Sequence, residues 1–159
     1  VSIANAPPDR FSSPSDETML AAASVNACNL CHLDRSIRWT VTALAERWGA
    51  RVALEPDWQL AYRGFDEPVG PLWIMSDDAA LRQAAVAAYG RSGSDALPAI
   101  LPKLDDPVPV NRMFALFAVQ DLLGCQLPVE RYDPAAEPAR RRLQIQRLAA
   151  DLERACASD

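Results

Sequence analysis

A helical hairpin is predicted by residues 97–115, which read Leu97-Pro98-Ala99-Ile100-Leu101-Pro102-Lys103-Leu104-Asp105-Asp106-Pro107-Val108-Pro109-Val110-Asn111-Arg112-Met113-Phe114-Ala115. The leucines and isoleucine of the first part recur at helical spacing and form one apolar face. Asp105-Asp106-Pro107 ends this first helix, and a second runs from Val108 to Leu123, where Gly124 ends it.

Similar helical patterns lie on both sides of this hairpin. Asp78 begins a helix that runs into Gly90, and Ser94 or Asp95 caps the helix from Leu97 to Leu104. Asp133-Pro134, an N-cap followed by proline at the first helical position, opens a long C-terminal helix to about Ala155. Because no segment shows the period of two that marks a strand, the sequence predicts an all-α fold.

The N-terminal half predicts shorter helices after an extended arm. Ser13-Pro14-Ser15-Asp16 gives a helix start with Ser13 as the cap, and Asn26 can cap the next turn. A short helix is possible from Trp58 to Tyr62. Asp34 or Ser36 begins a stronger helix that Gly49 ends, and its predicted apolar face consists of Ile37, Val41, Leu44 and Trp48.

The charge and hydropathy of the chain exclude two classes of protein. The chain has 159 residues and a net charge of -5, which argues against a nucleic-acid binder. No apolar run approaches the ~20 residues that span a bilayer. We therefore expect a protein that neither binds nucleic acid nor crosses a membrane with this chain.

One motif carries chemistry: Cys28-Asn29-Leu30-Cys31-His32. Two thiols separated by two residues on one helical turn can both form thioethers with the vinyl groups of one porphyrin. His32 then lies beneath the iron as the proximal ligand, and its other ring nitrogen is expected to donate to a backbone carbonyl. The motif therefore predicts one covalently attached haem c.

A zinc site or a redox-active dithiol is the alternative interpretation of the same cysteines. A structural zinc site needs four ligands, and Cys28, Cys31 and His32 supply at most three, so Cys125 or Cys156 would have to complete it. A thioredoxin-like pair would follow a strand of a βαβ unit, and the sequence predicts no such unit.

The residues around the motif resemble a known haem module. Asn26-Ala27-Cys28-Asn29-Leu30-Cys31-His32, with Asp34, Ser36, Trp39 and the later Trp48-Gly49, is similar to the haem block of certain multihaem cytochromes. In those proteins the block precedes TPR- or HEAT-type helical repeats. The resemblance spans about residues 25–124 and implies periplasmic, or otherwise extracytoplasmic, electron transfer.

The hairpin of residues 97–115 in turn resembles a HEAT repeat. In that family an Asp in the turn and an Arg early in the second helix bond across neighbouring repeats. Asp105 or Asp106 and Arg112 occupy those places here, and Asp78 and Arg82 form a weaker preceding copy. We expect one to two such units.

Together these features predict an N-terminal arm and haem-binding module in residues 1–76, and HEAT-like hairpins with a C-terminal helix in residues 77–159. The expected function is electron transfer by a monohaem cytochrome docked to redox partners in a larger complex, and not enzymatic catalysis. Two alternatives stay open: an interaction subunit with a vestigial or absent haem, and a haem sensor or enzyme with an open sixth site.

The sixth iron ligand is the least determined part of the site. His32 is the only histidine, so a second histidine cannot come from this chain. Methionine opposite histidine suits electron transfer. Met75 is the preferred ligand; the other candidates are Met19, Met113, Lys103, the amine of Val1 and a residue of a partner.

Several neighbouring residues have expected roles of their own. Arg35 and Arg38 could pair with the haem propionates, and Trp39 is expected to pack on the porphyrin or in the core. Met113, beside Val110, Phe114 and Phe117, is expected in the core of the second helix. Cys125 and Cys156 are expected either as a disulfide or as two buried thiols.

Overall fold

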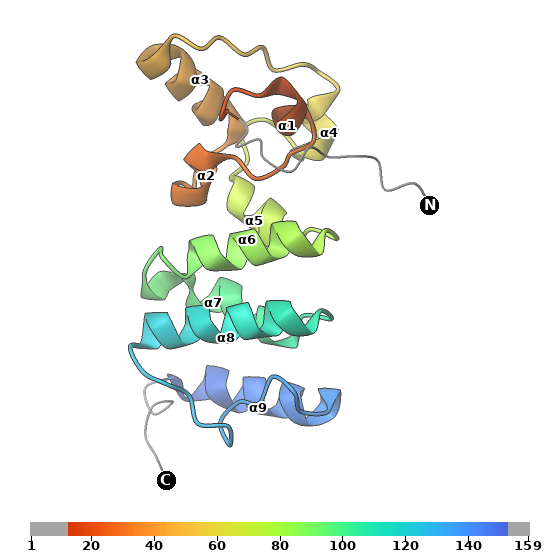
Figure 1. Ribbon diagram of the computed structural model, residues 1–159, viewed down its shortest axis with the longest axis vertical. Coiled ribbons are helices and arrows are strands. Elements are labelled where there is room, and N and C mark those ends of the chain that lie inside the picture. Colours follow the sequence, from red (N-terminus) through yellow and green to blue (C-terminus); the bar gives the residue numbers. More distant parts are fainter. Residues whose placement is uncertain (1–12, 153–159) are drawn as a thin grey trace.

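The computed structural model describes residues 13–152, which form helices joined by turns and contain no strand (Figure 1). This confirms the all-α fold. No helix in that range is long and apolar enough to cross a membrane. The helices are α1 (Glu17–Ala21), α2 (Ala27–Cys31), α3 (Ile37–Trp48), α4 (Trp58–Ala61), α5 (Val69–Ile74), α6 (Ala79–Tyr89), η1 (Ser94–Ala96), α7 (Leu97–Ile100), η2 (Leu101–Asp105), α8 (Pro109–Leu123) and α9 (Pro138–Ala150).

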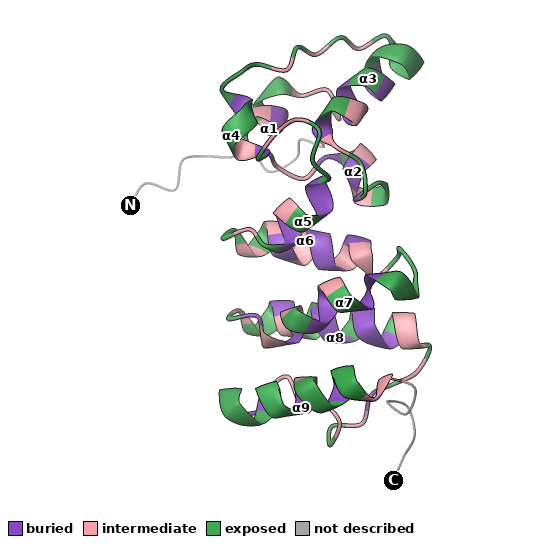
Figure 2. Ribbon diagram, turned by 180° about the vertical axis from the view of Figure 1, so that it is seen from behind, coloured by how far each residue is buried: buried purple, intermediate pink, exposed green. Residues whose placement is uncertain are grey.

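Three helices, which we call rungs, are stacked along the long axis of the molecule. These are α6, α8 and α9, while α1 to α4 gather at the other end (Figure 1). Helix α5 packs on α6, α7 and η2 pack on α8, and η2 also packs on α9. Figure 2 shows buried residues concentrated where these helices face one another.

The hydrophobic core is continuous across the predicted boundary between residues 76 and 77. One cluster runs from Leu20 in α1 to Leu148 in α9. Helix α5, which the sequence analysis did not predict, joins the two parts: it packs on α6, and its first amides, those of Val69 and Gly70, donate to the carbonyls of Arg35 and Leu33. The stack therefore begins at α5.

An arginine occupies the fourth position of each rung: Arg82 in α6, Arg112 in α8 and Arg141 in α9. Each donates back to the turn before its own helix, through the carbonyls of Ser76 and Asp77, of Asp106, and of Ala136, all at 2.9 Å. Each also reaches a neighbouring unit, at the Asp106 carboxylate, the Pro134 carbonyl and the Asp105 carboxylate respectively. Arg82 and Arg112 thus reach the following unit, whereas Arg141 reaches the preceding one.

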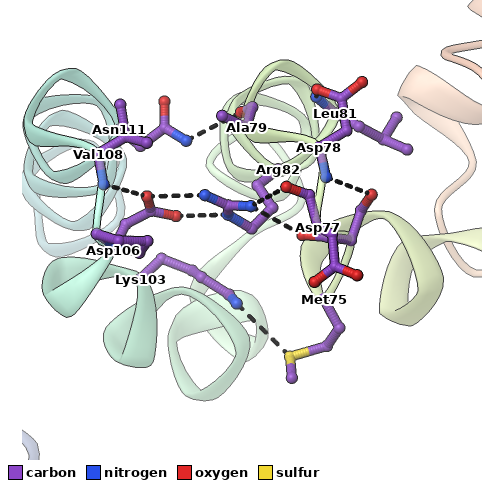
Figure 3. Close-up of polar contacts among 12 residues, drawn as sticks. Met75, Asp77, Asp78, Ala79, Leu81, Arg82, Lys103, Asp106, Val108 and Asn111 are labelled. Atoms are coloured by element: carbon purple, nitrogen blue, oxygen red, sulfur yellow. Dashed lines mark hydrogen bonds and ion pairs between the residues drawn. The ribbon is translucent and has the colours of Figure 1, made fainter.

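The pair between Arg82 and Asp106 is the most buried of these contacts (Figure 3). Arg82 Nε and Nη2 donate to the two carboxylate oxygens at 2.7 and 3.1 Å. Burial alone would raise the pKa of Asp106, but the hydrogen bonds from Arg82 and the Val108 amide, with the charge of Arg82, hold it below its ordinary value. Arg82 belongs to the copy that precedes Asp106 in the sequence, so this pair joins neighbouring units.

Several predicted helix ends are confirmed. Asn26, Ser36 and Asp78 cap α2, α3 and α6 through their side chains. Gly49 and Gly124 end α3 and α8 at φ 67° and 71°, in the left-handed region that glycine adopts without strain. The helix near Trp58 is present as α4.

Other predicted boundaries are wrong, each for a local reason. Asp16 caps α1 in place of Ser13, because its carboxylate accepts from the amides of Thr18 and Met19. The helix from Leu97 breaks into α7 and η2 at Pro102, which lacks the N–H that would continue the helix.

The C-terminal helix begins at Pro138, not at Pro134. Tyr132 is buried, and its hydroxyl donates to the Leu104 carbonyl at 2.6 Å; burial raises its pKa to about 12. Arg112 Nε donates to the Pro134 carbonyl at 2.9 Å. These contacts hold the segment before Pro138 against η2 and α8, so the helix begins only after it. The expected end near Ala155 lies outside the described residues.

One predicted core face is exposed. Val110, Met113, Phe114 and Phe117 lie on the solvent side of α8 and are 36 to 51% exposed. We call these four residues the α8 stripe. Trp48, which was placed on the apolar face of α3, is also exposed.

Candidate functional site

The motif forms a short helix whose cysteines are free. Asn26 caps α2 by accepting from the Cys28 amide at 2.9 Å, and the His32 amide donates to the Cys28 carbonyl. Cys28 and Cys31 are three residues apart on this single turn and carry free thiols. His32 follows directly after the last helical residue. The helix therefore presents the two thiols and the imidazole from one short element.

The two thiols differ in exposure. Cys31 is exposed and Cys28 is half-buried. Burial raises the pKa of the Cys28 thiol, and the neighbouring Cys31 adds to the increase. Neither cysteine is buried, as attachment of a porphyrin requires.

A cleft opens beside each cysteine. The cleft at Cys28 has a volume of about 230 Å³, and its apolar walls include Pro14, Leu44, Trp48 and Ala50. The cleft at Cys31 has a volume of about 740 Å³ and lies between the motif and the stack. Its lining includes Leu30, Leu33, Pro68, Pro71, Tyr89 and Arg91.

His32 is exposed, and its ring packs against Trp39. The two ring centroids are 4.8 Å apart, at an interplanar angle of 55°. Trp39, expected on the porphyrin or in the core, is thus a neighbour of the proposed iron ligand. Within residues 13–152 neither ring nitrogen of His32 forms a hydrogen bond, so the expected bond to a backbone carbonyl is not present there.

Arg35 and Arg38 are both paired with carboxylates. Arg35 lies 3.1 Å from Asp34 and places its guanidinium 6.0 Å from the Trp39 ring centroid. Arg38 donates to both oxygens of Asp66 at 2.7 and 3.3 Å, and these bonds raise the pKa of Arg38. A propionate at either arginine would compete with these acids.

Arg91 is a basic residue near the motif that the sequence analysis did not consider. It lines the cleft at Cys31 together with Tyr89, and among the described residues it has no ion-pair partner. It lies after Gly90, the residue that ends α6, and is far in the sequence from Cys31, so no local signal linked it to the motif.

Among the described residues, Met19, Met75, Lys103 and Met113 do not line the clefts at Cys28 and Cys31. Met75 is exposed, and its sulfur lies 3.5 Å from Lys103 Nζ, so two of the candidates meet each other (Figure 3). Burial, with the nearby charge of Arg82, lowers the pKa of Lys103. Met19 lines a separate cleft against α6, Met113 belongs to the α8 stripe, and Val1 lies outside the described residues. Met75 as the ligand stays a prediction.

No set of three or more His, Cys, Asp or Glu side chains that could hold a metal ion forms within residues 13–152. Cys125, one possible fourth zinc ligand, is disulfide-bonded. Cys156, the other possible ligand and its expected disulfide partner, lies outside the described residues.

The donors of the motif fit a covalently attached haem. Two free thiols share one helical turn, and an imidazole follows them whose nitrogens bond to no group in residues 13–152. The clefts beside the two cysteines have largely apolar walls. No protein-family model, no curated protein and no solved structure matches the chain.

Proposed function

We propose that this chain is a monohaem c-type cytochrome that transfers electrons outside the cytoplasm and is not an enzyme. One observation carries the proposal: a single turn of α2 presents the free thiols of Cys28 and Cys31, and His32 follows, with neither ring nitrogen bonded to another residue of the described range 13–152. The chemistry needs these residue types at this spacing.

Each residue has a defined task in this proposal. Cys28 and Cys31 tether the porphyrin through thioethers, and His32 supplies a nitrogen to the iron. Trp39 packs against the imidazole and limits its rotation. The haem, when bound, takes up and releases one electron at its iron.

The helical stack supports a docked carrier. The arginine at the fourth position of each rung, and the pairing of Arg82 with Asp106 across units, favour a HEAT-like repeat with three units. The α8 stripe is an exposed apolar face of the kind that marks contacts between proteins. We infer that a redox protein of a larger complex, with an apolar patch of its own, packs on it.

A second candidate function is a haem protein with an exchangeable sixth ligand. It is favoured by the positions of the three methionines, none of which lines a cleft beside a cysteine. Carbon monoxide added to the reduced protein separates the two functions. Slow or partial binding indicates an internal ligand, whereas rapid stoichiometric binding favours the open site.

The test of the main proposal is a pyridine haemochrome spectrum of the full chain, produced in a bacterial host that attaches c-type haem. The wild-type chain is expected to show a c-type α band that survives denaturation and acid extraction. The Cys28→Ser/Cys31→Ser variant loses this band. A wild-type chain without the band contradicts the proposal and favours an interaction subunit without haem.

A further inference from the structure

Asn29, which lies between the two cysteines, is completely buried and uses its whole side chain in hydrogen bonds. Its amide nitrogen donates to the carbonyls of His32 and Arg35 at 3.2 and 3.3 Å. Its amide oxygen accepts from the hydroxyl of Thr40 at 2.7 Å. Both Asn29 and Thr40 have an exposed fraction of 0%. Carbonyls only accept, so this amide orientation is the one that satisfies all three partners.

These bonds tie three elements around the turn that carries His32. Asn29 belongs to α2, Thr40 belongs to α3, and the two carbonyls lie in the turn between those helices. The Arg35 carbonyl also accepts from the Val69 amide at 3.1 Å, which extends the connection to α5. The Thr40 hydroxyl is closer to Asn29 than to the Ser36 carbonyl, at 2.7 against 3.4 Å, so its proton serves Asn29.

The orientation of His32 depends on this backbone. Because neither ring nitrogen bonds to a protein group among the described residues, the imidazole is held by its own main chain and by its packing against Trp39. In most metal sites a hydrogen bond on the second ring nitrogen performs this task. Here the hydrogen bond is made to the backbone of the ligating residue and not to its ring: the Asn29 amide donates to the His32 carbonyl.

We propose that Asn29 and Thr40 form a brace that would position His32 to hold the iron of a bound haem. The inference rests on the proposed function. It assigns to Asn29 and Thr40 the role of positioning residues, since neither would touch the iron. Without the brace, the turn between α2 and α3 would be less rigid. The imidazole would then be displaced more often, and the iron of a bound haem would lose this ligand for a larger fraction of the time.

Thr40→Val is the decisive variant, because valine keeps the shape of threonine and removes only the hydroxyl. Loss of a group bonded directly to a ligating side chain weakens metal ligation ~10–100-fold. Because Thr40 acts on His32 only through Asn29, we expect the high-spin fraction of the haem to increase by at most about tenfold, with a shift in midpoint potential. Thr40→Ser retains the hydroxyl and restores the wild-type spectrum. Thr42→Val, at an exposed position of the same helix, leaves spin state and potential unchanged.

The measurements are absorption and electron paramagnetic resonance spectra, with circular dichroism to verify folding. The brace is contradicted if Thr40→Val matches the wild type and Thr42→Val in spin state and potential. It is equally contradicted if Thr40→Val lowers the melting temperature but leaves the haem spectrum unchanged, since that is a purely structural role. A wild-type chain that carries no haem contradicts the proposed function instead, so the two failures are distinguishable.

Discussion

The turn around His32 and the stack of rungs hold their polar groups in different ways. In the stack, arginine occurs at the same helical position three times and bonds carbonyls and carboxylates of adjacent turns. Around α2, the bonds of the buried Asn29 with Thr40 and with two backbone carbonyls have no counterpart in the described rungs. In the stack, the contribution of the arginine contacts to stability is shared by several units. Around α2, single bonds hold one short turn, the one that carries His32. This difference suits a scaffold and a site respectively.

The comparison predicts that the buried pair of the stack dominates stability. Asp106→Ala leaves Arg82 buried without its partner, and we expect a loss of about 3–5 kcal/mol in the free energy of unfolding. Asp66→Ala breaks the exposed pair with Arg38 and is expected to cost less than about 1 kcal/mol. Urea denaturation followed by circular dichroism compares the free energies of unfolding of the two variants. Equal losses would show that the stack does not depend on the pair of Arg82 with Asp106.

The junction between the two regions gives the next effect. A Cβ at Gly70 would meet the Tyr89 hydroxyl and lie 3.0 Å from Leu33 Cβ and its carbonyl oxygen. Gly70→Ala is therefore expected to cost about 1–3 kcal/mol, because a packed core tolerates added volume poorly. Tyr89→Phe in the same chain removes the nearest atom and should recover part of the loss. If the double variant is as unstable as Gly70→Ala alone, the clash is not at Tyr89.

The pH dependence of stability sharpens the role of Asp106. Its pKa is below the ordinary carboxyl value in the folded chain, so the stabilisation is complete above the unfolded pKa and is lost as pH falls through the folded one. Between pH 7 and pH 3 the free energy of unfolding of the wild type should fall by more than that of Asp106→Asn. Parallel curves for the two proteins would mean that another carboxylate dominates acid unfolding.

The α8 stripe should give the smallest change in stability. Phe117 is half exposed and contacts Phe114 with centroids 6.4 Å apart. Phe117→Ser is expected to change the free energy of unfolding by at most about 0.5–1 kcal/mol, as exposed positions do. Val119→Ser, at a fully buried position of the same helix, is the matched control and should cost more. Similar losses would place the stripe in the core after all.

Several helix ends in both regions were predictable from the residues that form them. Asp78, Gly49 and Gly124 mark helix ends through their own side chains or φ angles, and the structure confirms each. The start of α9 was not predictable, because the local signal at Asp133-Pro134 is overridden by Tyr132, whose partner Leu104 is 28 residues away. Helix α5 was missed because Gly70 and Pro71 interrupt its pattern. The α8 stripe was misplaced because its helical spacing looks the same whether a partner covers it or not.

At the candidate site, the residues of the motif could be found from spacing, but their supports could not. The bond from Thr40 to Asn29 spans 11 residues and the pair of Arg38 with Asp66 spans 28. Such contacts depend on the tertiary packing of α2, α3 and the segment before α5. Arg91 likewise lines the cleft at Cys31 only because tertiary packing brings the end of α6 beside the motif.

The most direct test of an electron-carrying haem on α2 is an equilibrium redox titration of the purified full-length chain, followed at the α band. The account predicts one covalently bound haem per chain that is reduced and reoxidised in a single reversible one-electron step. A chain without covalent haem, or one whose haem does not cycle reversibly, would contradict it.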